Sequence, residues 1–154
     1  MGSLRIGSVN CRGLSSDKIK RRDIFNKCRN NYDITFLIDT HSDKSVENVW
    51  KTEWGYEAYF NSRTSNSRGV AILFSNSFVF DVLSVKKDGS GNLLIVNINI
   101  KSCDKSIVLV AVYGPNENDD NFYHNLQNQL HICENTSIII GGDWNVPQNY
   151  ISDT

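Results

Sequence analysis

The stretch Ser137-Ile138-Ile139-Ile140-Gly141-Gly142-Asp143-Trp144-Asn145 says most about the fold class of this chain. Its β-branched run from Ser137 to Ile140 is typical of a buried strand. We predict that the strand stops at the two glycines, where the backbone can approach a ligand because no Cβ intervenes. Asp143 and Asn145 follow at once, and polar groups just past the carboxyl end of a strand usually belong to a site in α/β proteins. The stretch alone is equally consistent with an Asp-x-Asn turn whose side chains bond only nearby backbone.

Length and composition indicate a globular domain. The chain has 154 residues, of which 40% are hydrophobic, so it is one domain or part of one and can bury a core. It has no apolar run of the 18 or so residues that a membrane helix needs, and we expect no membrane association. The cysteines are far apart and form no Cys-x-x-Cys pair, which indicates free thiols in a reducing compartment rather than zinc or disulfides. They are Cys11, Cys28, Cys103 and Cys133.

Charge is distributed unevenly along the chain, although the net charge is only −1. Residues 1–30 hold eight Lys or Arg against two acids, whereas residues 106–154 hold six acids and no Lys or Arg. A basic N-terminal half suits a protein that meets a polyanion on one side. A cluster such as Lys18, Lys20, Arg21 and Arg22 is equally typical of an ordinary solvated helix face.

Apolar runs and turn residues predict more strands than helices. We therefore expect an α/β sandwich with much antiparallel pairing rather than a simple alternation of strands and helices. Expected strands are 5–10, 34–38, 57–60, 69–74, 78–85, 93–100, 106–112 and 137–140. We expect two helices, one that begins at residues 15–17 and one that spans residues 122–130.

Small polar clusters follow four of these strands. Asn10 ends the first, Asp39-Thr40-His41 follows the second, and Tyr113 to Asn116 and Asp143 to Asn145 follow two later ones. If the strands lie side by side with these ends together, the oxygen donors of these clusters form one site. The clusters contain no Cys nucleophile and no Cys/His spacing typical of a zinc site. Such a set, with one or two carboxylates, is what Mg²⁺ prefers, and it predicts metal-assisted hydrolysis of a phosphate ester.

Four ordered motifs resemble those of the endonuclease/exonuclease/phosphatase superfamily, which has the DNase I-like fold. Details of the first two motifs, together with residues 67–73, are most similar to the endonuclease domain of LINE-type (non-LTR) retrotransposons. The resemblance implies a four-layer α/β sandwich of two packed, mainly antiparallel sheets flanked by helices. The motifs are Ser8-Val9-Asn10-Cys11-Arg12-Gly13-Leu14, Phe36-Leu37-Ile38-Asp39-Thr40-His41, Val112-Tyr113-Gly114-Pro115-Asn116 and Gly142-Asp143-Trp144-Asn145.

Carried over to this chain, the resemblance implies a metal and a water at the site. Asn10 and Asp39 would hold Mg²⁺, with Mn²⁺ as a possible substitute, and Asp143 would orient or deprotonate the attacking water. Thr40 and His41 would support the metal carboxylate, His41 by hydrogen bonding rather than by metal ligation.

The same resemblance implies contacts to the nucleic acid. Tyr113 and Asn145 would contact the scissile phosphate, with Asn116 beside them. Arg12 and Arg68 would contact the DNA backbone.

Two departures from the family pattern affect these expectations. The family usually has Glu where this chain has Asp39, which is one methylene shorter and still an oxygen ligand. The family also ends with a Ser-Asp-His motif that has no counterpart here, because neither His124 nor His131 has that context. We therefore expect residues 1–154 to be a single domain that corresponds to the N-terminal two-thirds of the family domain, incomplete at its C-terminal end.

The leading hypothesis is a retrotransposon endonuclease domain that nicks one strand of double-stranded DNA with Mg²⁺. Its expected partner in the full element is a fused reverse transcriptase, and its expected location is intracellular, cytoplasmic on synthesis and nuclear where it acts. One alternative is a truncated, non-catalytic remnant that binds DNA or metal at most. Another is a small-molecule phosphoesterase of the same superfamily.

Overall fold

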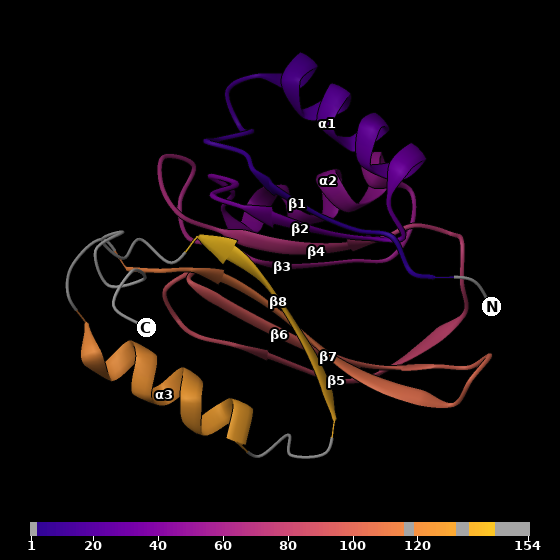
Figure 1. The fold of residues 1–154 in the computed structure, drawn as a ribbon. Helices are drawn as coiled ribbons and strands as arrows, with labels where there is room; N and C mark the ends of the chain where they lie inside the picture. The colour runs from indigo at the N-terminus through magenta and orange to yellow at the C-terminus, as the bar shows by residue number, and fades with distance from the viewer. Residues whose placement is uncertain (1–2, 116–118, 132–135, 144–154) are drawn as a thin grey trace, which may run out of the picture.

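The computed structural model describes residues 3–115, 119–131 and 136–143, and these form two four-stranded sheets packed face to face (Figure 1). The order of the first sheet is β1-β2-β4-β3 and that of the second is β5-β6-β7-β8. The strands are β1 (Ile6–Asn10), β2 (Ile34–Ile38), β3 (Ala58–Asn61), β4 (Val70–Phe74), β5 (Phe80–Lys87), β6 (Leu93–Ile100), β7 (Lys105–Tyr113) and β8 (Ser137–Asp143).

Helices cover the outer face of each sheet, which gives four layers (Figure 1). α1 (Lys18–Asn31), the 3-10 turn η1 (Lys44–Val46) and α2 (Glu47–Trp54) lie over the first sheet, and α3 (Asp120–His131) lies over the second. Each sheet has one parallel pair, β1 with β2 and β7 with β8, and the other pairs are antiparallel. The expected four-layer sandwich with mainly antiparallel sheets is therefore confirmed.

The core has three parts because each sheet is apolar on both faces. One cluster lies between the sheets, a second between the first sheet and α1 and α2, and a third between the second sheet and α3. Every residue of β2 and of β4 is buried, as expected for strands covered on both sides. α1 begins at the N-cap Asp17, whose carboxylate accepts the Lys20 N–H at 2.9 Å.

The prediction that the last strand stops at Ile140 is wrong, because β8 continues through both glycines to Asp143. The glycines serve close packing instead of ending the strand. A Cβ on Gly141 would lie 2.6 Å from the ring of Phe36 in β2, and one on Gly142 would overlap the carbonyl of Val112 in β7. The absence of side chains here lets β8 lie close to β7 in its own sheet and pack against β2 of the facing sheet.

Three further features bear on the sequence-based expectations. Helix α2 was not predicted. In the described part of the chain, no helix is long and apolar enough to span a membrane. Cys11, Cys28 and Cys103 are free thiols, as expected, whereas Cys133 lies outside the described residues.

Candidate active site

The polar residues after β1 and β2 lie side by side at one end of the first sheet. The two strands are parallel and in register, with Asn10 opposite Ile38, so that Asp39 directly follows the residue paired with Asn10. Asn10 is exposed and Asp39 is half-buried. This end of the sheet therefore presents a carboxamide and a carboxylate from neighbouring strands.

The second sheet contributes two more polar residues at the same end of the molecule. β7 and β8 are parallel and pair Tyr113 with Asp143, and the Gly114 N–H donates to the Asp143 carbonyl at 2.5 Å. Gly141 packs on Phe36, and the arrow of β8 in Figure 1 points to the end of the sandwich at which β1 and β2 finish. Asn10, Asp39, Tyr113 and Asp143 thus share one end of the two sheets.

The Asp39-Thr40-His41 loop holds its carboxylate through an internal contact. His41 Nε2 lies 2.8 Å from Asp39 Oδ1, and the side chains of this pair are 25% and 16% exposed. The imidazole rests on Gly13, where a Cβ would lie 2.6 Å from His41 Nδ1. This contact orients the carboxylate of Asp39 through Oδ1, and among the described residues no hydrogen bond to its Oδ2 is found.

Backbone hydrogen bonds join the three loops around this pair. Gly13 N–H donates to the Asp39 carbonyl at 2.9 Å, Thr40 N–H to the Gly69 carbonyl at 3.0 Å, and His41 N–H to the Arg68 carbonyl at 2.8 Å. Non-glycine residues with positive φ cluster in the same loops, and strained backbone of this kind concentrates at functional sites. They are Arg12, Asp39, His41 and Arg68, with φ of 50°, 59°, 53° and 61°.

Buried hydroxyl groups brace the loop from behind. Thr40 Oγ1 lies 2.8 Å from Ser42 Oγ, which in turn lies 2.8 Å from Ser62 Oγ. Thr40 and Ser42 are both fully buried, whereas Ser62 is half-buried, so the Thr40–Ser42 contact is shielded from water. The sequence analysis assigned a supporting role to Thr40 but not to Ser42 or Ser62, since serines in expected loops carry no distinguishing pattern.

The donor set suits a hard cation. Among the described residues, no group of three or more His, Cys, Asp and Glu side chains is arranged to hold a metal ion. Mg²⁺ needs fewer protein ligands than that, because it binds through one or two carboxylates and takes water and substrate phosphate for the remaining positions. Asn10 and Asp39 offer oxygen donors of this kind, and the residues present therefore fit Mg²⁺.

Two titratable groups near the site, Cys11 and Tyr123, have raised pKa values. Cys11 follows Asn10 directly but its thiol is buried, and burial raises its pKa to about 12. It is therefore protonated at neutral pH and is no nucleophile. On α3, burial first and then the charges of Asp119 and Asp143 raise the pKa of Tyr123 above its ordinary value.

Of the other residues predicted to contact the nucleic acid, the structure describes the two arginines and not the two asparagines. Arg12 is exposed, whereas Arg68 is half-buried and its guanidinium Nη1 lies 3.4 Å from the Ser90 carbonyl and from Asn92 Oδ1. Asn116 and Asn145 lie outside the described residues. Buried Asn92, which joins Arg68 to Tyr113, was missed because it lies between the expected strands 78–85 and 93–100, where asparagine is typical of a turn.

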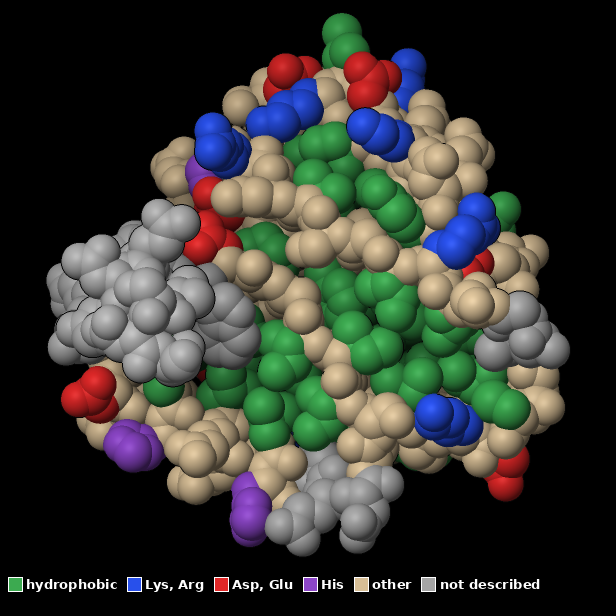
Figure 2. Space-filling view, viewed as in Figure 1, with side chains coloured by type: hydrophobic (Ala, Val, Ile, Leu, Met, Phe, Trp, Pro, Cys, Tyr) green, Lys and Arg blue, Asp and Glu red, His purple; other side chains and the backbone are tan. Residues whose placement is uncertain are grey.

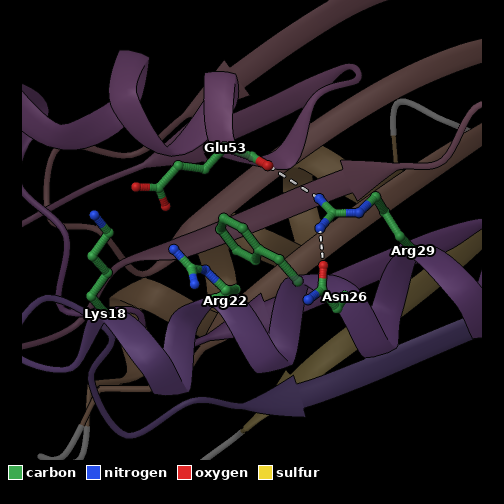
Figure 3. Close-up of a pocket in the computed structure, with 6 residues that line it drawn as sticks. Lys18, Arg22, Asn26, Arg29 and Glu53 are labelled. Carbon is green, nitrogen blue, oxygen red and sulfur yellow. Dashed lines mark hydrogen bonds between the residues drawn. The ribbon is translucent and has the colours of Figure 1, made fainter.

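A pocket on the helical layer contains part of the basic cluster (Figure 3). Its volume is about 340 Å³, and it lies between α1 and α2, where it is lined by Lys18, Arg22, Phe25, Asn26, Arg29 and Glu53. Arg29 Nη1 donates to the Trp54 carbonyl at 2.6 Å and thereby closes the end of α2. Much of the basic character here therefore serves the fold.

The side chain of Arg21 also makes contacts within the fold. Its guanidinium makes two hydrogen bonds to Glu53, at 2.8 and 2.9 Å, and lies over the ring of Trp50. The hydrogen bonds from Arg21, despite burial, hold the pKa of Glu53 below its ordinary value. In the described part of the chain Lys18 and Arg22 have no salt bridge, and Figure 2 shows Lys and Arg side chains gathered over this helical layer.

Comparison with known proteins supports both the fold and a link to a transposon. No family model matches the sequence. The chain is 33% identical, over 117 residues, to an uncharacterized 149 kDa protein of transposon TX1 from Xenopus laevis; the match covers 74% of this chain and 9% of that protein.

Solved structures share the fold at low sequence identity. An endonuclease/exonuclease/phosphatase family protein from Bacteroides thetaiotaomicron has a TM-score of 0.70 at 14% identity, over 96% of this chain and 65% of that one. The catalytic domain of human Nocturnin, with a bound sulfate anion, has a TM-score of 0.68 at 13% identity, over 94% of this chain and 64% of that one. The chain therefore spans about two thirds of these structures.

The chain has the fold of these solved structures, one of which is an endonuclease/exonuclease/phosphatase family protein, and this is the fold that the four motifs led us to expect. Its sequence is similar to part of a transposon protein.

Proposed function

We propose that this chain is the metal-dependent endonuclease of a LINE-type retrotransposon, which nicks one strand of double-stranded DNA. The observation that carries the proposal is the common end of the two sheets, where the paired Asp39 and His41 lie beside Asn10 and the facing sheet adds Tyr113 and Asp143. The relationship to a transposon protein favours DNA over a small phosphate ester as the substrate.

Asn10 and Asp39 hold Mg²⁺, or Mn²⁺ in its place, in this proposal. When bound, the ion neutralises charge on the phosphate and stabilises the charge that develops during hydrolysis. His41 keeps Asp39 Oδ1 oriented at 2.8 Å, and Thr40 anchors the loop through its bond to Ser42. Oriented carboxylates bind a metal more tightly than free ones because less side-chain freedom is lost on binding.

Asp143 positions the attacking water and accepts its proton. Tyr113 and Asn145 donate to the phosphate oxygens, with Asn116 beside them, and such donors stabilise the charge of the transition state. Arg12 and Arg68 contact the DNA backbone in this proposal. A fused reverse transcriptase is the expected partner in the full element, and the nucleus is where the domain would act.

A plasmid-nicking assay tests this function. We expect residues 1–154 by themselves to nick supercoiled DNA feebly in Mg²⁺, since these residues contain no Ser-Asp-His motif and an acid/base group typically contributes about 10²–10⁴-fold to the rate. Chelation and the substitutions Asp143→Ala and Asp39→Ala should abolish the remaining nicking. Asp81→Ala, at an exposed surface position on β5 paired with Lys101, is the matched control and should not change it.

Two results would overturn the proposal. One is robust nicking that survives Asp143→Ala, because the water-positioning role would then be wrong. The other is the absence of any metal-dependent nicking from a chain that unfolds cooperatively, because the site would then be folded and inactive.

A further inference from the structure

Asn92 lies in the turn between β5 and β6, at the junction of the two sheets. It is only 3% exposed. Asp88 fixes the turn by accepting backbone N–H groups on Oδ1, from Asn92 at 3.1 Å and from Leu93 at 3.2 Å. The carboxamide of Asn92 is thus buried at a defined position next to the end of β7.

Both ends of this carboxamide contact residues of the proposed site. Asn92 Nδ2 donates to the backbone carbonyl of Tyr113 at 2.6 Å, and the backbone N–H of Tyr113 donates to the backbone carbonyl of Asn92 at 2.8 Å. Asn92 Oδ1 faces Arg68 Nη1 at 3.4 Å. The Asn92 side chain therefore donates a hydrogen bond to the backbone of Tyr113 and accepts one from the guanidinium of Arg68.

The same turn reaches the loop that carries Asp39. Gly69 N–H donates to the Gly91 carbonyl at 3.2 Å, and the Gly69 carbonyl accepts the Thr40 N–H at 3.0 Å. A continuous series of hydrogen bonds thus runs from Thr40, beside Asp39, through Gly69 and the turn to Tyr113. It joins the half of the site on the first sheet to the half on the second.

We propose that Asn92 is a positioning residue that holds Tyr113 and Arg68 in register with the Asp39 loop. This inference rests on the proposed nuclease function. A carboxamide is needed because the residue must donate to a carbonyl and accept from a guanidinium with the same planar group. Aspartate keeps the acceptor and loses the donor, and its charge would face the Tyr113 carbonyl.

Asn92→Asp is the informative substitution, and Asn61→Asp is its matched control. Asn61 is also buried at the junction of the sheets, and its Nδ2 donates to the Leu93 carbonyl at 2.7 Å and to Asp88 Oδ1 at 2.9 Å. It touches the same turn, yet no hydrogen bond from it to Tyr113 or Arg68 is found in the described structure. Both substitutions should lower stability, and Asn92→Asp should disturb Tyr113 more, because Asn61 acts on the turn through Asp88 and the Leu93 carbonyl and not through Tyr113 itself.

Two measurements follow Tyr113 separately from stability. The first is the fluorine NMR spectrum of the chain labelled with 3-fluorotyrosine, in which the Tyr113 resonance is assigned by its loss in Tyr113→Phe. The second is steady-state nicking of a short labelled duplex in Mg²⁺. We expect Asn92→Asp to shift the Tyr113 resonance and to lower kcat about 10–100-fold below Asn61→Asp, because misplacement of a contact by about 1 Å can cost 10²-fold.

Each outcome decides the proposal. An unmoved Tyr113 resonance in Asn92→Asp, or kcat equal to that of Asn61→Asp in an active chain, overturns it. A wild-type chain that never nicks refutes the nuclease function, and the fluorine spectrum then still decides whether Asn92 positions Tyr113. In Tyr113→Phe, which keeps the backbone contact and lacks only the hydroxyl, Asn92→Asp should lower kcat less than in the wild-type chain, because the hydroxyl that Asn92 positions is already absent.

Discussion

Replacing Gly69 by alanine should destabilise this fold by about 2–5 kcal/mol. Gly69 has φ of 92° and lies beneath the Asp39-Thr40-His41 loop. A Cβ there would overlap Thr40 Oγ1 and lie 3.1 Å from Ser42 Oγ, and both of these side chains are fully buried. The substitution therefore combines backbone strain with overpacking against groups that have little room to move.

Gly55 allows the two costs to be separated. It ends α2 with φ of 93°, and a Cβ there would meet no heavy atom within 4 Å. Gly55→Ala should therefore cost only the strain of a left-handed backbone, about 1–2 kcal/mol. Gly69→Ala should cost about 1–3 kcal/mol more, which is the usual penalty for an extra methyl group in a packed interior.

Urea denaturation of the two variants, followed by tryptophan fluorescence, measures this difference. For a chain of this size the excess corresponds to a melting temperature lower by about 2–12 °C in Gly69→Ala than in Gly55→Ala. Equal losses in the two variants would refute the steric argument. Thr40→Ala removes the clashing oxygen, so its combination with Gly69→Ala should be less costly than the sum of the single changes by about 0.5–3 kcal/mol.

Three further predictions follow from the described contacts. An aromatic disulfide reagent at pH 8 should label exposed Cys103 and spare Cys11, whose burial raises its pKa to about 12; peptide mapping that finds Cys11 labelled first would contradict this. At Asp33, burial favours the neutral carboxyl, but hydrogen bonds from Ser77 and Arg5 outweigh it and hold the pKa below its ordinary 3.8. The stability that these bonds supply is therefore lost as the pH falls below that value. Asp33→Asn should accordingly flatten the acid limb of a series of denaturation measurements at different pH. If the α1 face meets DNA, Lys18→Gln with Arg22→Gln should lower the salt dependence of DNA binding by a slope of about 2, whereas Lys86→Gln with Lys87→Gln on β5 should leave it unchanged.

The charge pattern shows how far the sequence can be taken. It predicts a basic N-terminal half, and the Lys and Arg side chains do gather over α1 and α2. The sequence does not indicate that Arg21 pairs with Glu53 or that Arg29 caps α2, because both partners come from a helix 24 or more residues away. Counting charges therefore overstates how many cations are available to a partner.

Helix α2 was missed for a related reason. It has eight residues, and its only buried side chains are Trp50 and Trp54, so the apolar pattern is too short to distinguish a helix. Its stability comes from packing, with Trp54 edge-on to Phe25 of α1 and its indole N–H bonded to the Phe74 carbonyl at 2.9 Å. Neither contact has a local signature.

By itself the sequence determined where along the chain the strands lie and which polar groups come near their ends, because apolar runs and the polar groups after them are local features. Only the tertiary structure decided that Asn10, Asp39, Tyr113 and Asp143 share one end of the molecule. Parallel pairing joins β1 to β2 and β7 to β8, and Gly141 of β8 packs on Phe36 of β2 in the facing sheet. The same holds for Gly141, which ended a strand in the sequence-based prediction. In the structure it continues the strand, because Phe36 of the facing sheet occupies the space that a side chain would need.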